Sequence, residues 1–233
     1  QLIRTAFVAA PGNVLIDADF SAIEARVISW LADEEWRLEV FRTHGKIYEA
    51  SASQMFGVPL ERIKKGNPEY ALRQRGKVAE LALGYQGGVA AMRQMDTGKL
   101  LADLPDEEIK DIVDKWRNTN PKIRNLWYSF NDAAIRVIQN GGSLRVRCCT
   151  FARECDCIRG TTCMTISLPS GRKLYYVEPA VGENRWGGPS ITYMGVNDKN
   201  KWGRIETYGG KLVENVVQAI ARDCLAQTIE HLE

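Results

Sequence analysis

One stretch near the N-terminus, residues 14–30 (VLIDADFSAIEARVISW), combines the signals of a strand, a turn and a helix. The apolar, β-branched run Val14–Ile16 predicts a short buried strand. Asp17 and Asp19 follow at strand spacing, so their carboxylates would leave the same face of that strand.

The helix behind this strand is predicted to begin at Ser21 and to run to about Asp33. Ser21 precedes Glu24 by three residues, which is the capping-box pattern, and apolar residues recur behind it at helical spacing. An acid at a strand end beside a helix N-terminus is held on rigid structure near free N–H groups, which favours a functional site. The alternative is that both aspartates are loop acids and that Glu24 only caps the helix.

Length and composition allow one substantial core, but they do not indicate a particular binding partner. A chain of 233 residues can fold as one large domain or as two closely packed lobes, and a formal net charge of +2 neither requires nor excludes a polyanionic partner. No apolar run approaches the roughly 18 residues of a membrane span, and no signal peptide opens the chain, so no membrane partner is expected. The first residue is Gln1 rather than Met, which suggests a piece of a longer protein.

Cysteines cluster in the second half of the chain. The six are Cys148, Cys149, Cys155, Cys157, Cys163 and Cys224. A cluster this dense could bind zinc, but neither CC nor CxC is the usual CxxC knuckle and no histidine lies nearby. Disulfides would need an oxidising compartment that nothing else indicates. Free thiols are therefore favoured, and a zinc-organised interaction module remains an alternative.

Helical and strand patterns together predict an α+β fold. Helices are predicted at Glu35–Thr43, Ile47–Phe56, 69–85, Asp106–Trp116, Pro121–Asn140 and Leu212–Leu232. Between residues 141 and 202, glycine-containing turns separate short strands, predicted at Met164–Leu168, Lys173–Val177 and Ile191–Met194.

The helix at 69–85 carries two cations and an aromatic ring on its polar side. Arg73 and Lys77 lie one turn apart, and Tyr85 falls two turns beyond Lys77 on roughly the same side. Two cations at this spacing can grip a polyphosphate, and a ring at the helix end can stack on a base. The alternative is a solvated basic face with a half-buried tyrosine.

Three segments together resemble the family A (DNA polymerase I-like) DNA polymerases. The pattern Arg73-x-x-x-Lys77-x-x-x-Leu81-x-x-x-Tyr85 is similar to that family's motif B, and residues 19–26 (DFSAIEAR) are similar to its motif A. Between them, Ile47-Tyr48-Glu49-Ala50 followed by Met55-Phe56-Gly57 resembles the family's helix that ends in a Phe-Gly pair. Leu81 and Gly84 resemble the bacteriophage and prophage members.

This resemblance implies a right-hand polymerase palm sheet with a mostly helical fingers subdomain inserted. Residues 1–34 would belong to the palm, 35–140 to the fingers with motif B at about 69–85, and 141–233 would return to the palm and end in its C-terminal helix. The implied activity is DNA-directed DNA polymerisation, the transfer of a nucleotide from a dNTP to a primer 3′-OH by a two-metal mechanism.

The resemblance also assigns roles around the incoming nucleotide. Asp19 and the backbone carbonyl of Phe20 would bind Mg²⁺. Arg73 and Lys77 would hold the dNTP phosphates, with Lys77 also protonating the leaving pyrophosphate.

Four further side chains would shape the nucleotide pocket. Glu24 would exclude a ribose 2′-hydroxyl, and Tyr85 would stack by the templating base. Leu81 replaces an aromatic residue of many relatives and offers no hydroxyl, so strong discrimination against dideoxynucleotides is expected. Tyr48 stands where the family commonly has a histidine that contacts phosphate.

The last predicted helix would contact primer–template DNA through Asn215, Gln218 and Arg222. The family spaces its Asn and Gln four apart, whereas here the spacing is three, so Glu214 is the alternative for the Asn position.

Parts of such a polymerase are expected outside this chain. The family's second catalytic carboxylate belongs to a His-Asp-Glu hairpin after the last helix, and the ending His231-Leu232-Glu233 is no substitute for it. The thumb is expected upstream. The chain is thus expected to be inactive alone, to need the rest of the polymerase chain as its partner, and to work in the cytoplasm of a bacterial host if it is phage-encoded. A non-catalytic, nucleic-acid-binding or complementing part of a split polymerase is the alternative.

Overall fold

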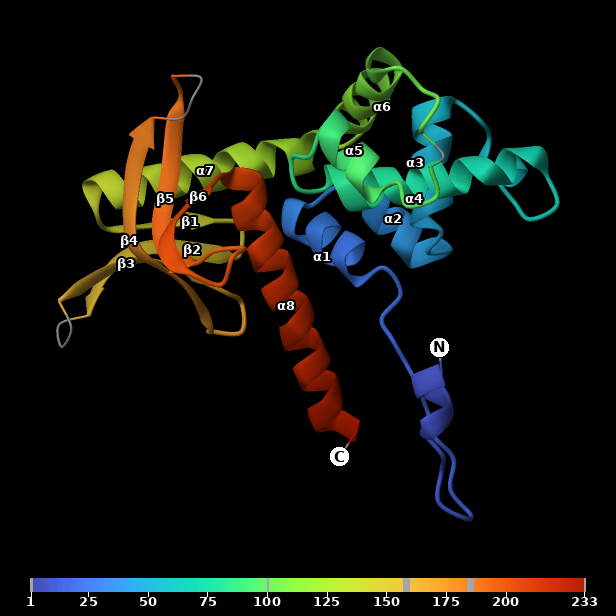
Figure 1. Ribbon diagram of the computed structural model, residues 1–233, viewed down its shortest axis with the longest axis horizontal. Helices are drawn as coiled ribbons and strands as arrows, with labels where there is room; N and C mark the ends of the chain where they lie inside the picture. The colour runs from blue at the N-terminus through green and yellow to red at the C-terminus, as the bar shows by residue number, and fades with distance from the viewer. Residues whose placement is uncertain (1, 100, 157–159, 184–186, 233) are drawn as a thin grey trace.

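The computed structural model describes residues 2–99, 101–156, 160–183 and 187–232 and has an α+β fold, with a sheet to one side and most helices to the other (Figure 1). The α-helices are α1 (Ile23–Ala32), α2 (Glu35–Thr43), α3 (Ile47–Phe56), α4 (Ala71–Leu83), α5 (Val89–Met95), α6 (Asp106–Thr119), α7 (Pro121–Asn140) and α8 (Gly209–Leu232). The 3-10 helices are η1 (Leu2–Ala6), η2 (Leu60–Arg62) and η3 (Pro68–Tyr70). The strands are β1 (Ser143–Val146), β2 (Cys149–Asp156), β3 (Thr161–Ser167), β4 (Lys173–Glu183), β5 (Pro189–Val196) and β6 (Trp202–Thr207).

The sheet is an antiparallel meander in which each strand pairs with its neighbour in sequence, in the order β1-β2-β3-β4-β5-β6. The register between β4 and β5 shifts between Val177 and Ala180, where Glu178 adopts a positive φ of 46° and forms a bulge. Helix α7 packs across β1, β2 and β4, and Phe130 meets Phe151 edge to face with ring centroids 5.0 Å apart.

The helices share one core with the inner face of the sheet. Trp116 and Trp127 are both buried and stack with ring centroids 6.3 Å apart, as expected of core residues. The indole N–H of Trp127 donates to the carbonyl of Gly84 at 2.8 Å, so α7 is tied to the end of α4. Helix α8 packs beside α1 and α7, and its C-terminal half projects beyond the sheet (Figure 1).

The predicted helices are confirmed with small changes of boundary. The helix predicted at 69–85 is α4, which covers Ala71–Leu83 and follows a 3-10 turn at Pro68–Tyr70. All three predicted strands exist, and β4 is longer than predicted because it continues past its bulge to Glu183. Strands β1, β2 and β6 and the short helix α5 were not predicted. In the described ranges, no helix is both long and apolar enough to cross a membrane.

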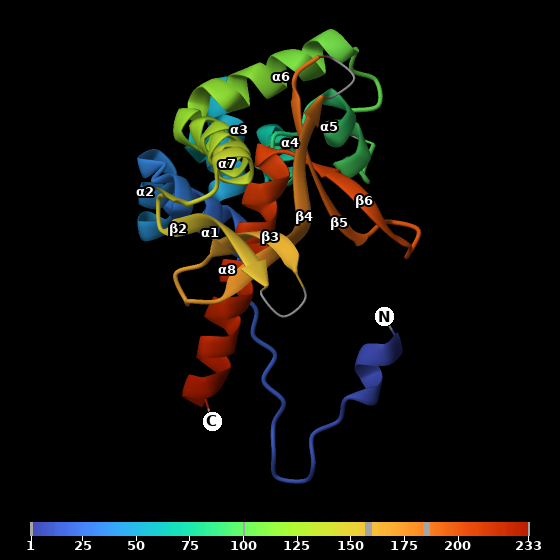
Figure 2. The same ribbon diagram turned by 90° about the vertical axis from the view of Figure 1, so that its left-hand side faces the viewer.

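The strand predicted at Val14–Ile16 is wrong. Residues 7–20 have no regular structure, and Val14, Leu15 and Ile16 are 80%, 63% and 88% exposed. The segment leads away from the body of the molecule (Figure 2). A strand needs a neighbour for its backbone N–H and C=O groups, and in the part of the chain that the structure describes no strand pairs with this run.

The predicted capping box is also wrong. The residue before α1 is Ala22, in the left-handed conformation with φ 51°, and no side chain caps this end. The Glu24 carboxylate is therefore available for contacts with other helices.

Candidate active site

Helices α1 and α4 face each other across a cavity of about 220 Å³. Its lining includes Phe20, Glu24, Tyr48, Leu81 and Tyr85. Residues from all three segments singled out in the sequence thus meet at one cavity, because α3 and α4 pack closely and α1 lies across the end of α4.

Glu24 lies at the centre of this arrangement. Its Oε1 accepts a hydrogen bond of 2.5 Å from the side-chain amide of Gln218 on α8, and its Oε2 accepts a long one of 3.5 Å from the hydroxyl of Tyr85. Burial raises the pKa of Tyr85, and the nearby carboxylates of Glu24 and Glu214 raise it further, so the phenol stays neutral and acts as a donor.

A second cavity of about 480 Å³ shares part of its lining with the first. Its lining includes Glu24, Leu81, Tyr85, Lys211 and Gln218. Glu24, Leu81 and Tyr85 line both cavities.

Arg73 is held in place by neighbours on α3. Its Nε donates to Glu49 Oε1 at 2.8 Å, and its guanidinium carbon lies 5.4 Å from the ring centroid of Tyr48 and 5.9 Å from that of Tyr70. Burial, and next the charge of Glu80, raise the pKa of Tyr48, which keeps this hydroxyl neutral too. Tyr48 and Arg73 thus lie close together. Both residues were predicted from the sequence to contact phosphate, and this prediction needs them near each other.

Lys77 is half-buried one turn further along α4. Among the residues that the structure describes, it makes no ion pair and no side-chain hydrogen bond. An ammonium group without an internal partner is available to an anionic ligand.

Asp19 lies in the irregular segment before α1 and is exposed. The carbonyl of Phe20 and the Asp19 carboxylate are hard oxygen donors of the kind that Mg²⁺ takes, but they supply a single carboxylate. Over the described ranges, no group of three or more His, Cys, Asp or Glu side chains could hold a metal ion. The donors fit Mg²⁺ in type, and a complete site needs further ligands from a substrate phosphate or another carboxylate.

A buried charge network under the cavity was missed in the sequence. The Arg37 guanidinium is 1% exposed and pairs in a bidentate manner with Glu80, with Nη1 2.9 Å from Oε1. Arg37 also donates to Ser29 Oγ at 2.7 Å and to Asn120 Oδ1 at 3.0 Å. The available signal was a charged residue on the otherwise apolar side of a helix, Glu80 next to Ala79 on α4.

The Glu80 carboxylate collects further donors from other helices. Ser51 Oγ donates to its Oε1 at 2.8 Å, and Trp116 Nε1 donates to the same oxygen at 3.0 Å. The network therefore connects α1, α2, α3, α4 and α6 with Asn120, the residue between α6 and α7. It fixes α4, which carries Arg73 and Lys77, against its neighbours.

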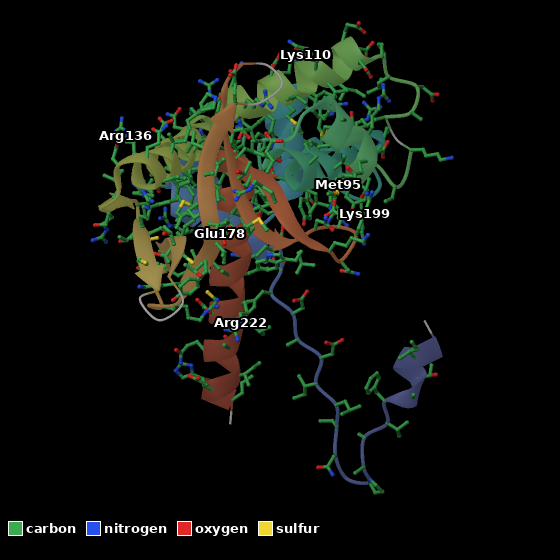
Figure 3. All side chains as sticks on the ribbon, turned by 60° about the vertical axis from the view of Figure 1, so that its left-hand side comes forward. Met95, Lys110, Arg136, Glu178, Lys199 and Arg222 are labelled. Carbon is green, nitrogen blue, oxygen red and sulfur yellow. The ribbon has the colours of Figure 1, made fainter. Side chains whose placement is uncertain are left out.

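The three residues predicted to bind DNA differ in their surroundings. The Asn215 amide donates to the buried Tyr176 hydroxyl at 3.0 Å, and Gln218 binds Glu24, so both have internal partners. Arg222 is 65% exposed on the projecting part of α8 (Figure 3), with Asp223 Oδ1 3.5 Å from its Nη1. Glu214, the alternative to Asn215, pairs with Lys211 at 3.0 Å.

Among the described residues, no cysteine belongs to a group of three or more side chains that could hold a metal ion. Burial raises the pKa of the Cys149 thiol to about 12, with Cys148 as a further cause, so this thiol stays protonated. Cys148 is half-buried, Cys155 and Cys224 are exposed, and Cys157 lies outside the described residues.

Comparisons with known proteins identify the family of this chain. The family model of DNA polymerase family A matches residues 1–141. The "DNA polymerase" of Bacillus phage SP02 is 52% identical over 235 residues, which cover 100% of this chain and 35% of the relative. The thermostable DNA polymerase I of Thermus aquaticus is 33% identical over 124 residues, 53% of this chain and 14% of its own length.

Solved structures match as well, among them the POL domain of Pol1 from M. smegmatis in complex with DNA primer-template and dNTP. It is 21% identical, has a TM-score of 0.43, and the match covers 68% of this chain and 21% of that chain.

The fold and the site define a mixed α+β protein with a cavity between two helices. The chain belongs to DNA polymerase family A, as the family model shows over more than half of its length. It spans 35% of the length of the phage relative.

Proposed function

We propose that this chain supplies the nucleotide-binding part of a DNA-directed DNA polymerase of phage type. The observation that carries the proposal is that Glu24, Tyr48, Leu81 and Tyr85 line one cavity, beside the two cations of α4. The reaction needs mainly positioning and charge neutralisation, and this arrangement offers both.

In the proposed reaction, the primer 3′-hydroxyl loses its proton to solvent, its oxygen forms a bond to the α-phosphorus of a dNTP, and the bond from that phosphorus to the leaving pyrophosphate breaks. Arg73, oriented by Glu49, holds the nucleotide phosphates together with Lys77, and Lys77 gives its proton to the pyrophosphate. Mg²⁺ bound at Asp19 and the carbonyl of Phe20, in a two-metal arrangement, would neutralise charge on the phosphates.

The remaining side chains select the nucleotide. Glu24 closes the cavity against a 2′-hydroxyl, Tyr85 lies by the templating base, and Leu81 brings no hydroxyl to replace a missing 3′-OH, so dideoxynucleotides are used poorly. Tyr48 contacts phosphate through its neutral hydroxyl. Arg222, on the exposed part of α8, contacts primer–template DNA, with Asn215 nearer the sheet.

We assign residues 1–34 and 141–233 to the palm and residues 35–140 to the fingers. Helices α2 to α6 gather on the side of the molecule away from the sheet, which supports this division (Figure 1). The second catalytic carboxylate, in a His-Asp-Glu segment, and the thumb are proposed to lie outside these residues, since the chain matches only 35% of the phage relative. A phage origin would place the protein in the cytoplasm of a bacterial host.

The proposal is tested by Glu24→Ala in the full gene product that contains these residues. Because the carboxylate that blocks the 2′-hydroxyl is removed, kcat/KM for ribonucleotides relative to deoxynucleotides should rise by at least about tenfold, or ~1.4 kcal/mol. Single-nucleotide primer extension measures this ratio, and Glu61→Ala at an exposed site is the matched control. Equal rejection of ribonucleotides by Glu24→Ala would contradict the assignment.

A non-catalytic role, as the complementing part of a split polymerase, is the second candidate. It predicts that the full gene product binds primer–template DNA but extends it only when a second polypeptide is added.

A further inference from the structure

Gln218 and Glu24 are 194 positions apart in sequence, and their side chains share a hydrogen bond. The amide Nε2 of Gln218 lies 2.5 Å from Glu24 Oε1, whereas the Tyr85 hydroxyl lies 3.5 Å from Oε2. Each carboxylate oxygen thus faces a donor from a different segment, Tyr85 in the turn after α4 and Gln218 on α8, and the shorter contact comes from α8.

The first turn of α8 is fixed against the end of α4. A Cβ at Gly210 would lie 2.4 Å from the carbonyl oxygen of Tyr85, so only glycine allows this approach. The backbone N–H of Gly210 donates to Gln86 Oε1 at 3.1 Å, and that of Gly209 donates to Asn131 Oδ1 at 3.2 Å. Tyr85 and the start of α8 therefore cannot shift independently, and Gln218 follows on the same helix.

A carboxylate held at both oxygens occupies one place. A glutamate side chain otherwise samples many rotamers, and restricting them costs conformational entropy. Glu24 lines both the cavity of about 220 Å³ and that of about 480 Å³, so its position affects how much room the smaller cavity leaves for a ligand.

We infer that Gln218 is a positioning residue that holds the Glu24 carboxylate and thereby sets the discrimination between ribonucleotides and deoxynucleotides. The inference rests on the proposed function. It assigns to Gln218 a role toward a protein carboxylate instead of the DNA contact expected from the sequence, because the amide N–H points to Glu24. Figure 1 shows the two helices that carry this pair, α1 and α8, side by side.

The test is Gln218→Leu in the full gene product, with single-nucleotide incorporation of dCTP and rCTP on one primer–template. Loss of a hydrogen bond to a charged group should lower the ratio of kcat/KM for dCTP to kcat/KM for rCTP about tenfold. Gln227→Leu is the matched control, since Gln227 is an exposed glutamine on the same helix whose amide contacts only Glu230, at 3.2 Å. It should keep the ratio of the unmodified protein.

A double substitution separates positioning from a DNA contact. In a Glu24→Ala background, Gln218→Leu should change the ratio no further, because the group that Gln218 holds is gone. A DNA contact predicts a raised KM for primer–template that affects dCTP and rCTP alike and persists in that background. Such a result, or an unchanged ratio in Gln218→Leu, would overturn the inference while leaving polymerase activity established. Absence of extension by the unmodified protein would contradict the proposed function and this inference together.

Discussion

Gly76 lies where helix α4 comes closest to helix α3. A Cβ built at this position would lie 2.1 Å from the carbonyl oxygen of Tyr48, and backbone cannot yield as a flexible side chain can. The glycine is therefore needed for close helix packing, and this packing sets the distance between Tyr48 and Arg73.

Gly76→Ala should lower the free energy of unfolding by about 1–3 kcal/mol, because α3 and α4 must separate to admit the methyl group. Thermal unfolding followed by circular dichroism measures the effect. Gly84→Ala is the matched control near the same helix, since its Cβ would lie 3.5 Å from the nearest atom and alanine favours helix by up to about 1 kcal/mol. Equal melting temperatures for the two variants would show that the close approach of α3 and α4 at Gly76 does not contribute to stability.

The helices that build the cavity are joined by the Arg37–Glu80 network. Glu80→Leu leaves the buried Arg37 charge without its counterion and should cost about 3–5 kcal/mol in urea unfolding. Arg37→Met combined with Glu80→Leu removes both charges, so the double variant should lose less than the sum of the single losses.

The exposed pair Lys110–Asp114 on α6 provides the comparison for this network. Asp114→Leu should change the free energy of unfolding by no more than about 1 kcal/mol, because surface ion pairs contribute little. If the losses in free energy of unfolding caused by Arg37→Met and Glu80→Leu simply added up in the double variant, an energetic coupling between α2 and α4 would be contradicted.

The attachment of α8 to the sheet depends on pH through Asp223. Burial alone would raise the pKa of this carboxyl, but hydrogen bonds from Ser170 and Arg172, and the charges of Arg172 and Arg222, hold the pKa below its ordinary value of 3.8. A pKa lowered by folding means that the stabilisation is present above pH 3.8 and is lost as the pH falls through the lower, folded value.

Asp223→Asn should therefore destabilise the chain at pH 6 and much less at pH 2, where the wild-type carboxyl is becoming protonated too. Urea unfolding of both proteins at the two pH values measures the difference. The same difference at both pH values would show that the carboxylate charge does not stabilise the attachment of α8.

At the scale of elements, long periodic segments were predictable from sequence. The helices at Pro121–Asn140 and 69–85 were found because their apolar residues recur at helical spacing. This spacing places the apolar side chains on the side of the helix that packs against the core. The Val14–Ile16 run failed because a β-branched segment becomes a strand only beside another strand. Strand β6 was missed although Trp202–Thr207 alternates between exposed and less exposed residues.

At the scale of the whole molecule, the residue types of the candidate site were predictable but their partners were not. Glu24, Tyr48 and Tyr85 were singled out in the sequence, and the structure brings them to one cavity. The contact between Gln218 and Glu24 and the pairing of Arg37 with Glu80 connect residues far apart in sequence. Such contacts depend on how whole helices cross, which no local pattern encodes.

The central claim is nucleotidyl transfer that depends on Asp19, and primer extension tests it most directly. The full gene product, given Mg²⁺, four deoxynucleotides and a primer–template, should extend the primer. Asp19→Ala should abolish extension, whereas Asp17→Ala, which changes the neighbouring acid, should retain most of it. Absence of extension by the unmodified protein, or full extension by Asp19→Ala, would contradict the account.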